Sequence, residues 1–108
     1  MKIVVSLGES NFITQSSNPN HFSYDDDQDG HNDVDINGDN IQIVRNAESH
    51  TTRIYLGEIS YIEVENEQGI ARFNLKDVAI NKNNDYIYIV YKIDDESKEI
   101  RINYLGDK

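Results

Sequence analysis

The residues best able to do chemistry lie in one short segment, residues 25–39, which reads DDDQDGHNDVDINGD. Seven of its fifteen residues are Asp and none is Lys or Arg, so the segment supplies most of the formal net charge of −10. Carboxylates packed this closely repel one another unless a positive group neutralises them. Acids at alternate positions before a glycine are also how oxygen ligands wrap a hard cation. The segment therefore predicts a cation site.

The spacing predicts Ca²⁺ as the cation and assigns a role to each ligand. In a calcium loop the first, third and fifth positions give side-chain oxygens, a glycine follows for the sharp turn, and the next residue gives its carbonyl. The position that normally holds a bidentate acid is Ile36 here, so we expect modest affinity and a later Asp to complete the shell. The predicted ligands are Asp25, Asp27, Asp29, His31 through its carbonyl, and Asp33 or Asp35.

This segment resembles the DxDxDG calcium loops of EF-hand, dockerin and thrombospondin type 3 proteins. The resemblance covers the acidic segment alone and implies only the ligand roles given above. The flanking helices of an EF-hand and the cysteines of a thrombospondin repeat are not evident in the sequence. The alternative interpretation is a solvated acidic loop in which Asp-Gly and Asn-Gly simply make turns.

The elements that must position this segment are predicted to be strands. Apolar residues alternate with polar ones along most of the chain, which indicates an all-β fold of about eight short strands, a small antiparallel sandwich or barrel. The 108 residues are expected to form a single domain. Residues 15–24 read as a polar connection, residues 76–80 as either a strand end or a helical turn, and residues 34–43 as a hairpin centred on Asn37-Gly38. That turn would place Val34 opposite Ile41.

A tyrosine-rich strand near the C-terminus is the second candidate site. Residues 85–93 (DYIYIVYKI) are apolar on both faces of the predicted strand, and a small sandwich rarely buries both. Tyrosine is also a preferred interface residue because it combines an apolar ring with a polar tip. We expect a protein partner or a second copy of the chain to cover this strand, at Tyr86, Tyr88, Val90 and Tyr91.

Composition and motifs exclude several classes of function. The chain has no cysteine, so disulfides and thiolate chemistry are excluded, and no catalytic motif or histidine cluster indicates an enzyme. The acidic balance argues against direct nucleic-acid binding. The first ten residues and the remaining apolar runs are too short for a signal peptide or a membrane span, which predicts a protein of the cytoplasm or of a virus particle.

These observations favour a non-catalytic structural or accessory subunit of a larger protein assembly with a calcium-stabilised acidic loop. The general pattern is similar to small β-rich virion proteins of bacteriophages, a resemblance that rests on no diagnostic motif. Two alternatives remain open. One is an acidic inhibitor or nucleic-acid mimic that blocks a basic protein surface. The other is a calcium-dependent adhesion or binding module.

Overall fold

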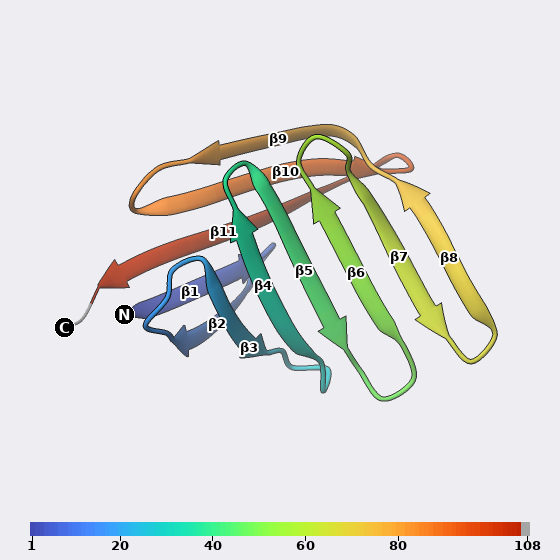
Figure 1. Cartoon of the computed structure of the whole chain (residues 1–108), viewed down its shortest axis with the longest axis horizontal. Helices are drawn as coiled ribbons and strands as arrows, with labels where there is room; N and C mark the ends of the chain where they lie inside the picture. The colour runs from blue at the N-terminus through green and yellow to red at the C-terminus, as the bar shows by residue number, and fades with distance from the viewer. Residues whose placement is uncertain (107–108) are drawn as a thin grey trace.

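A computed structural model describes residues 1–106 as two antiparallel β-sheets packed face to face (Figure 1). The all-β sandwich predicted from the alternating pattern is confirmed, with eleven strands instead of about eight. The strands are β1 (Lys2–Leu7), β2 (Ser10–Gln15), β3 (His21–Asp25), β4 (His31–Asn37), β5 (Asn40–Asn46), β6 (Thr51–Leu56), β7 (Tyr61–Asn66), β8 (Gly69–Asn74), β9 (Lys76–Lys82), β10 (Tyr86–Ile93) and β11 (Glu96–Gly106). The described residues include no helix that could span a membrane.

Within residues 1–106 the chain crosses between the sheets twice. One sheet has the order β2-β1-β11-β10-β9 and the other has β3-β4-β5-β6-β7-β8. The first crossing follows β2, and the second is Leu75, between β8 and β9. The Tyr104 hydroxyl donates a hydrogen bond of 2.9 Å to the Pro19 carbonyl, which ties the last strand to the first crossing.

Two segments that the sequence did not assign clearly to strands contain strands. Within residues 15–24, predicted to be a polar connection, β3 buries Phe22 and Tyr24. The alternation of apolar and polar residues is hard to detect in this strand because only these two of its residues are apolar. Residues 76–80, which were undecided between a strand end and a helical turn, belong to β9.

The β4–β5 hairpin also has a different register from the predicted one. Ile36 pairs with Ile41 and Val34 with Ile43, so the two loop residues are Gly38 and Asp39. Gly38 has a φ of 62°, whereas neither Asn37 nor Asp39 has a positive φ. A positive φ at the first central residue alone is the pattern of a type II′ turn, for which glycine is preferred. The predicted centre at Asn37-Gly38 is therefore wrong, although the apolar residues still share one face.

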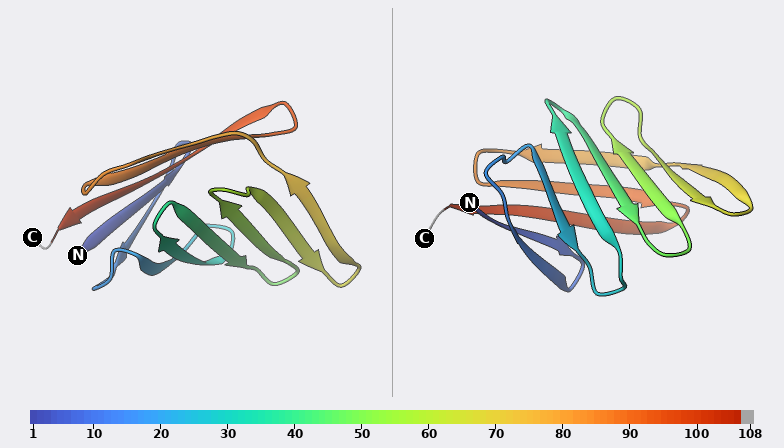
Figure 2. Two further views of the ribbon diagram at one scale, coloured as in Figure 1. Left: turned by 45° about the horizontal axis from the view of Figure 1, so that its top comes forward. Right: turned by 60° about the horizontal axis from the view of Figure 1, so that its bottom comes forward.

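The core lies where the two sheets overlap. Strands of the two sheets cross steeply, and the hairpin of β7 and β8 projects past the five-stranded sheet (Figures 1 and 2). Every strand of the overlap contributes, whereas no fully buried apolar residue of the described chain belongs to β2, β7, β8 or β9. The buried apolar residues are Ile3, Val5, Phe22, Tyr24, Val34, Ile36, Ile41, Ile43, Leu56, Ile87, Ile89, Tyr91, Ile100 and Ile102.

Truncation of a buried side chain on β10 should destabilise the fold more than truncation of an exposed side chain on β2. Ile89 is fully buried in β10, between β9 and β11. Ile89→Ala should lower the free energy of unfolding by about 3 kcal/mol, because it removes buried methylenes and leaves a cavity. The matched variant Ile13→Ala, at a β2 side chain that is 63% exposed, should change it by less than about 0.5 kcal/mol. Urea denaturation of both variants checks the assignment, and equal effects would contradict it.

Candidate functional site

The acidic segment is a hairpin, not an extended loop. β3 ends at Asp25 and β4 begins at His31, and the two residues pair across the hairpin. On the outer face of the sheet lie four of the predicted calcium ligands, namely Asp25, His31, Asp33 and Asp35. The other two, Asp27 and Asp29, lie in the exposed turn, where Asp29 has a φ of 58°.

Histidines on the outer face pair with three of these carboxylates. His31 Nδ1 lies 2.6 Å from Asp25 Oδ1, and His31 Nε2 lies 3.6 Å from Asp33 Oδ1. The hydrogen bond with Asp25, reinforced by Asp33, raises the pKa of His31. On the same face His21 Nδ1 contacts a carboxylate oxygen of Asp35. Three carboxylates of this face are therefore paired with two histidines.

No calcium cage stands out in this arrangement. Within residues 1–106 no three His, Asp or Glu side chains are grouped where they could hold a metal ion. Neither Asp27 nor Asp29 has a side-chain hydrogen bond or ion pair in this part of the chain. The predicted Ca²⁺ site stays a prediction, for which calorimetric titration with Ca²⁺ is the direct test.

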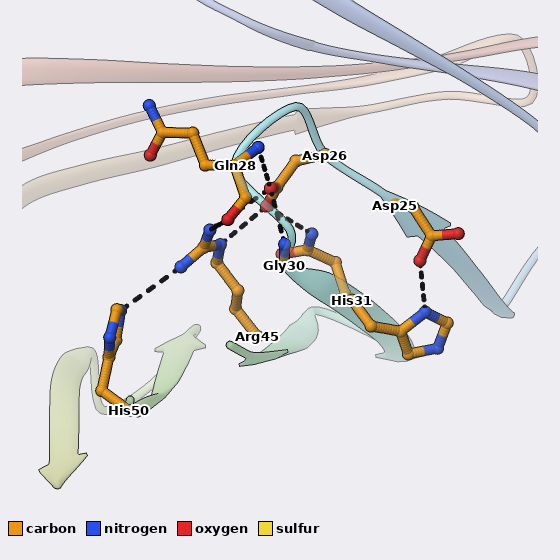
Figure 3. A network of polar contacts seen from close by, with 8 residues as sticks. Asp25, Asp26, Gln28, Gly30, His31, Arg45 and His50 are labelled. Atoms are coloured by element: carbon orange, nitrogen blue, oxygen red, sulfur yellow. Dashed lines mark hydrogen bonds and ion pairs between the residues drawn. The ribbon is translucent and has the colours of Figure 1, made fainter. Parts of the chain in front are cut away.

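Asp26 is the acid that turns inward. Its Oδ1 accepts hydrogen bonds of 3.0 Å from the backbone N–H groups of Gln28 and Gly30, and its Oδ2 accepts one of 3.0 Å from Asn32 Nδ2. Arg45, on β5, donates from Nε to Oδ2 at 2.6 Å and from Nη2 to Oδ1 at 3.2 Å. This carboxylate is fully satisfied, and the Arg45 guanidinium neutralises its charge (Figure 3).

Arg45 extends the network to two other segments. Its Nη2 donates to the Gln28 carbonyl at 3.3 Å, and its Nη1 lies 3.3 Å from His50 Nε2 (Figure 3). Because a guanidinium only donates, His50 accepts this contact at Nε2, and its Nδ1 lies 3.1 Å from the Ser49 hydroxyl. The network therefore joins the β3–β4 turn, β5 and the β5–β6 turn.

Gly30 is required by this ion pair. A Cβ built on Gly30 would lie 2.5 Å from an Asp26 carboxylate oxygen and closer still to the Arg45 guanidinium. The sequence assigned Gly30 to the sharp turn of a calcium loop, but the positive φ of the turn belongs to Asp29. Gly30 instead leaves room for the salt bridge.

Neither Asp26 nor Arg45 was predicted, although the period of the strands contains a signal for both. Asp26 continues the inward positions of Phe22 and Tyr24, and Arg45 continues those of Ile41 and Ile43. An acid and a base at the inward ends of the two strands that flank β4 are candidates for a partly buried ion pair. Asp26 is the middle of three consecutive Asp residues, so its residue type alone does not distinguish it.

A groove of about 700 Å³ opens between the sheets beside this network. Apolar side chains from both sheets line it, and the Asp26–Arg45 pair forms part of one wall. Its lining includes Phe12, Tyr24, Asp26, Asn32, Ile43, Arg45, Thr52, Ile54, Tyr91, Lys98, Glu99 and Ile100. Such a mixture of apolar walls and few polar groups is typical of a ligand site.

The predicted interface residues of β10 divide between its two faces. Tyr91 points inward and is 6% exposed, so it belongs to the core and the groove and not to an outer surface. Tyr86, Tyr88 and Val90 point outward and are half-buried. The Arg101 guanidinium covers the Tyr88 ring at 5.1 Å. The outer set is thus neither fully buried nor a freely exposed apolar patch.

The fold and groove define the class of the molecule as a two-sheet antiparallel sandwich with an amphipathic groove between its sheets. No protein-family model, no curated protein and no solved structure matches the chain. The function is therefore argued from the geometry.

Loss of the Asp26 charge should alter both the stability and its pH dependence. Arg45 and the other donors hold the pKa of Asp26 well below its usual range. A carboxyl group with a lowered folded-state pKa stabilises the fold above its unfolded pKa of about 4, and this contribution is lost as the pH falls. Asp26→Asn should cost about 2–3 kcal/mol at neutral pH, since it removes charge-assisted hydrogen bonds around a largely buried side chain.

The matched control is Asp27→Asn, at an exposed side chain in the same turn. Urea denaturation at pH 7 and at pH 3 should show a gap between wild type and Asp26→Asn that narrows at the lower pH, while Asp27→Asn follows the wild type. A gap that is independent of pH would contradict the assigned role of Asp26.

Proposed function

We propose that this chain is a non-catalytic subunit of a protein assembly, and that two copies join through the edge strand β8. The observation that carries the proposal is the exposure of β8, in which all six residues are exposed, including Ile70 at 63% and Phe73 at 44%. An edge strand presents unpaired N–H and C=O groups, so an exposed apolar edge is a ready site for pairing with another strand.

The other edges of the two sheets are protected. β9 carries Lys76 and Lys82 near its ends and is interrupted by an irregularity at Asp77, where φ is 51°. The edges β2 and β3 lie beside each other, so each limits access to the other. Lysines, bulges and coverage are the usual devices that prevent edge-to-edge pairing.

β8 has none of these devices. Its sequence, GIARFN, contains no Lys and no Pro, and its register with β7 is regular. The charge of its single Arg72 is directed back into its own sheet, where the guanidinium donates to Glu63 at 2.7 Å and covers the Tyr61 ring at 4.2 Å. The open edge is therefore specific to this strand.

The sequence of β8 is also complementary to itself. Its register with β7 places Gly69, Ala71 and Phe73 on the inner face of the sheet. In an antiparallel pair of two copies with Ala71 opposite Ala71, each Phe73 lies opposite Gly69 of the other copy. An aromatic side chain across from an edge glycine covers the backbone that the glycine exposes. The same register separates the two Arg72 charges.

The assembly is tested by the mass in solution. Light scattering at high protein concentration should give about twice the chain mass of 12.4 kDa for the wild type. Phe73→Lys should give the mass of one chain, because a lysine at the edge blocks pairing. The matched control Ile59→Lys changes a side chain that is 75% exposed but lies outside β8, and it should leave the dimer intact.

The register is tested by a cysteine placed on the twofold axis. The chain has no native cysteine, so Ala71→Cys supplies one thiol per copy. Directly opposed positions can form a disulfide, whereas Phe73→Cys, which lies opposite Gly69, should not. Mild oxidation should therefore produce a covalent dimer for Ala71→Cys only. A monomeric wild type, or crosslinking of both variants alike, would contradict the proposal.

A further inference from the structure

The groove between the sheets contains polar atoms that the protein leaves without partners. Tyr24 and Tyr91 are 5% and 6% exposed, and Asn32 is 3% exposed, yet all three line the groove. Within residues 1–106 no protein group hydrogen-bonds to either hydroxyl or to the Asn32 carbonyl oxygen. No enclosed side-chain oxygen or nitrogen in this part of the chain lacks a partner, so these three atoms must reach the groove surface.

These atoms define the hydrogen bonds that a ligand can make. Each tyrosine hydroxyl can donate one and accept others, and the Asn32 oxygen accepts. Burial raises the pKa of Tyr24 to about 12 and also raises that of Tyr91, so both hydroxyls keep their protons near neutral pH. A complementary ligand must therefore offer both acceptors and donors.

The charges around the groove do not favour an anionic ligand, because its lining includes the carboxylate of Asp27, which has no ion pair within residues 1–106. Asp26 and Arg45 neutralise each other, and the Asp26 carboxylate already accepts five hydrogen bonds. At the rim, Lys98 pairs with Glu96 at 3.2 Å, and Glu99 lies 3.3 Å from the Arg101 guanidinium. Taking an anion into such a groove would cost desolvation energy without a compensating partner.

The apolar walls require a ligand that also has an apolar surface. Phe12 stacks on Tyr24 with ring centroids 5.6 Å apart and remains partly exposed, while Ile43, Ile54 and Ile100 complete the walls. A sugar ring meets both demands, because its C–H face is apolar and its hydroxyls both donate and accept. An extended peptide fits less well, since the edge strands β2 and β3 that border the groove lie beside each other, and each limits access to the backbone groups of the other.

From these features we infer that the groove binds an uncharged saccharide, with hydrogen bonds to Tyr24, Tyr91 and Asn32 and with its apolar face against Phe12. The groove lies between the two sheets, and β8 contributes no residue to its lining. The inference therefore does not depend on the proposed assembly.

The first step of the test is an array that carries both neutral and acidic glycans, with the whole chain as the probe. Binding to neutral glycans is expected, followed by calorimetric titration with the best neutral oligosaccharide. Tyr24→Phe and Tyr91→Phe each remove one hydroxyl and keep the ring, and each should weaken binding by about 5–10-fold. Tyr88→Phe, on the outer face of the same strand as Tyr91, is the matched control and should bind as the wild type does.

Circular dichroism and thermal unfolding establish that the phenylalanine variants are folded. The inference is overturned if no neutral glycan binds, if acidic glycans bind better, or if both groove variants keep the wild-type affinity. Selection from a random peptide library tests the competing occupant, which is a protein segment. Peptides that bind the wild type but not Tyr24→Phe, in the absence of glycan binding, would assign the groove to a protein segment instead.

Discussion

The overlap between two crossed sheets is the constraint from which the other features of this molecule follow. Apolar side chains can be buried only where one sheet covers the other, and here the overlap lies over β3 to β6 on one side and β1, β10 and β11 on the other. Beyond it, the inner face of the six-stranded sheet continues without a cover. The row of paired residues Ile43, Ile54, Ile62 and Phe73 passes from fully buried at β5 to exposed at the edge strand β8. The closed core, the groove and the open edge are successive parts of one surface.

A second row of paired residues explains why the groove is polar at one side. Tyr24, Asn32, Arg45 and Thr52 are neighbours across β3 to β6, and all four face inward. The inner face thus changes from apolar to polar along one line across the sheet. Arg45 can remain there because Asp26 compensates its charge, and the pair is accommodated because Gly30 has no side chain. Breaking such a pair leaves a largely buried charge without a partner. The pair therefore contributes more to fixing one arrangement of the hairpin than to net stability.

The all-β class was predictable because it depends on the period of the apolar residues, which is local information. The strands missed were those with little apolar content, such as β3, and the hairpin register was wrong because Asn37-Gly38 and Gly38-Asp39 are both acceptable turn centres. The sequence predicted a metal ion as the positive partner of the acidic segment and did not predict Arg45. Arg45 is nineteen residues away from Asp26, and only the pairing of β4 with both β3 and β5 brings the two residues together. The groove depends on the crossing of the sheets, which no local pattern specifies. Tyr91 was assigned to an interface for the same reason.

The two proposed surfaces would act together if copies pair as β8 suggests. A twofold axis perpendicular to the sheet keeps the inner faces of both copies on the same side, so both grooves would lie on the same side of the joined sheet. Two identical sites on one side can engage neighbouring units of a repetitive ligand, and the second contact then forms within the complex. Avidity of this kind can exceed the affinity of a single site by orders of magnitude without any new contact. An unprotected edge in a chain that guards its other edges therefore has a physical rationale, since pairing would convert one weak neutral site into a bivalent one.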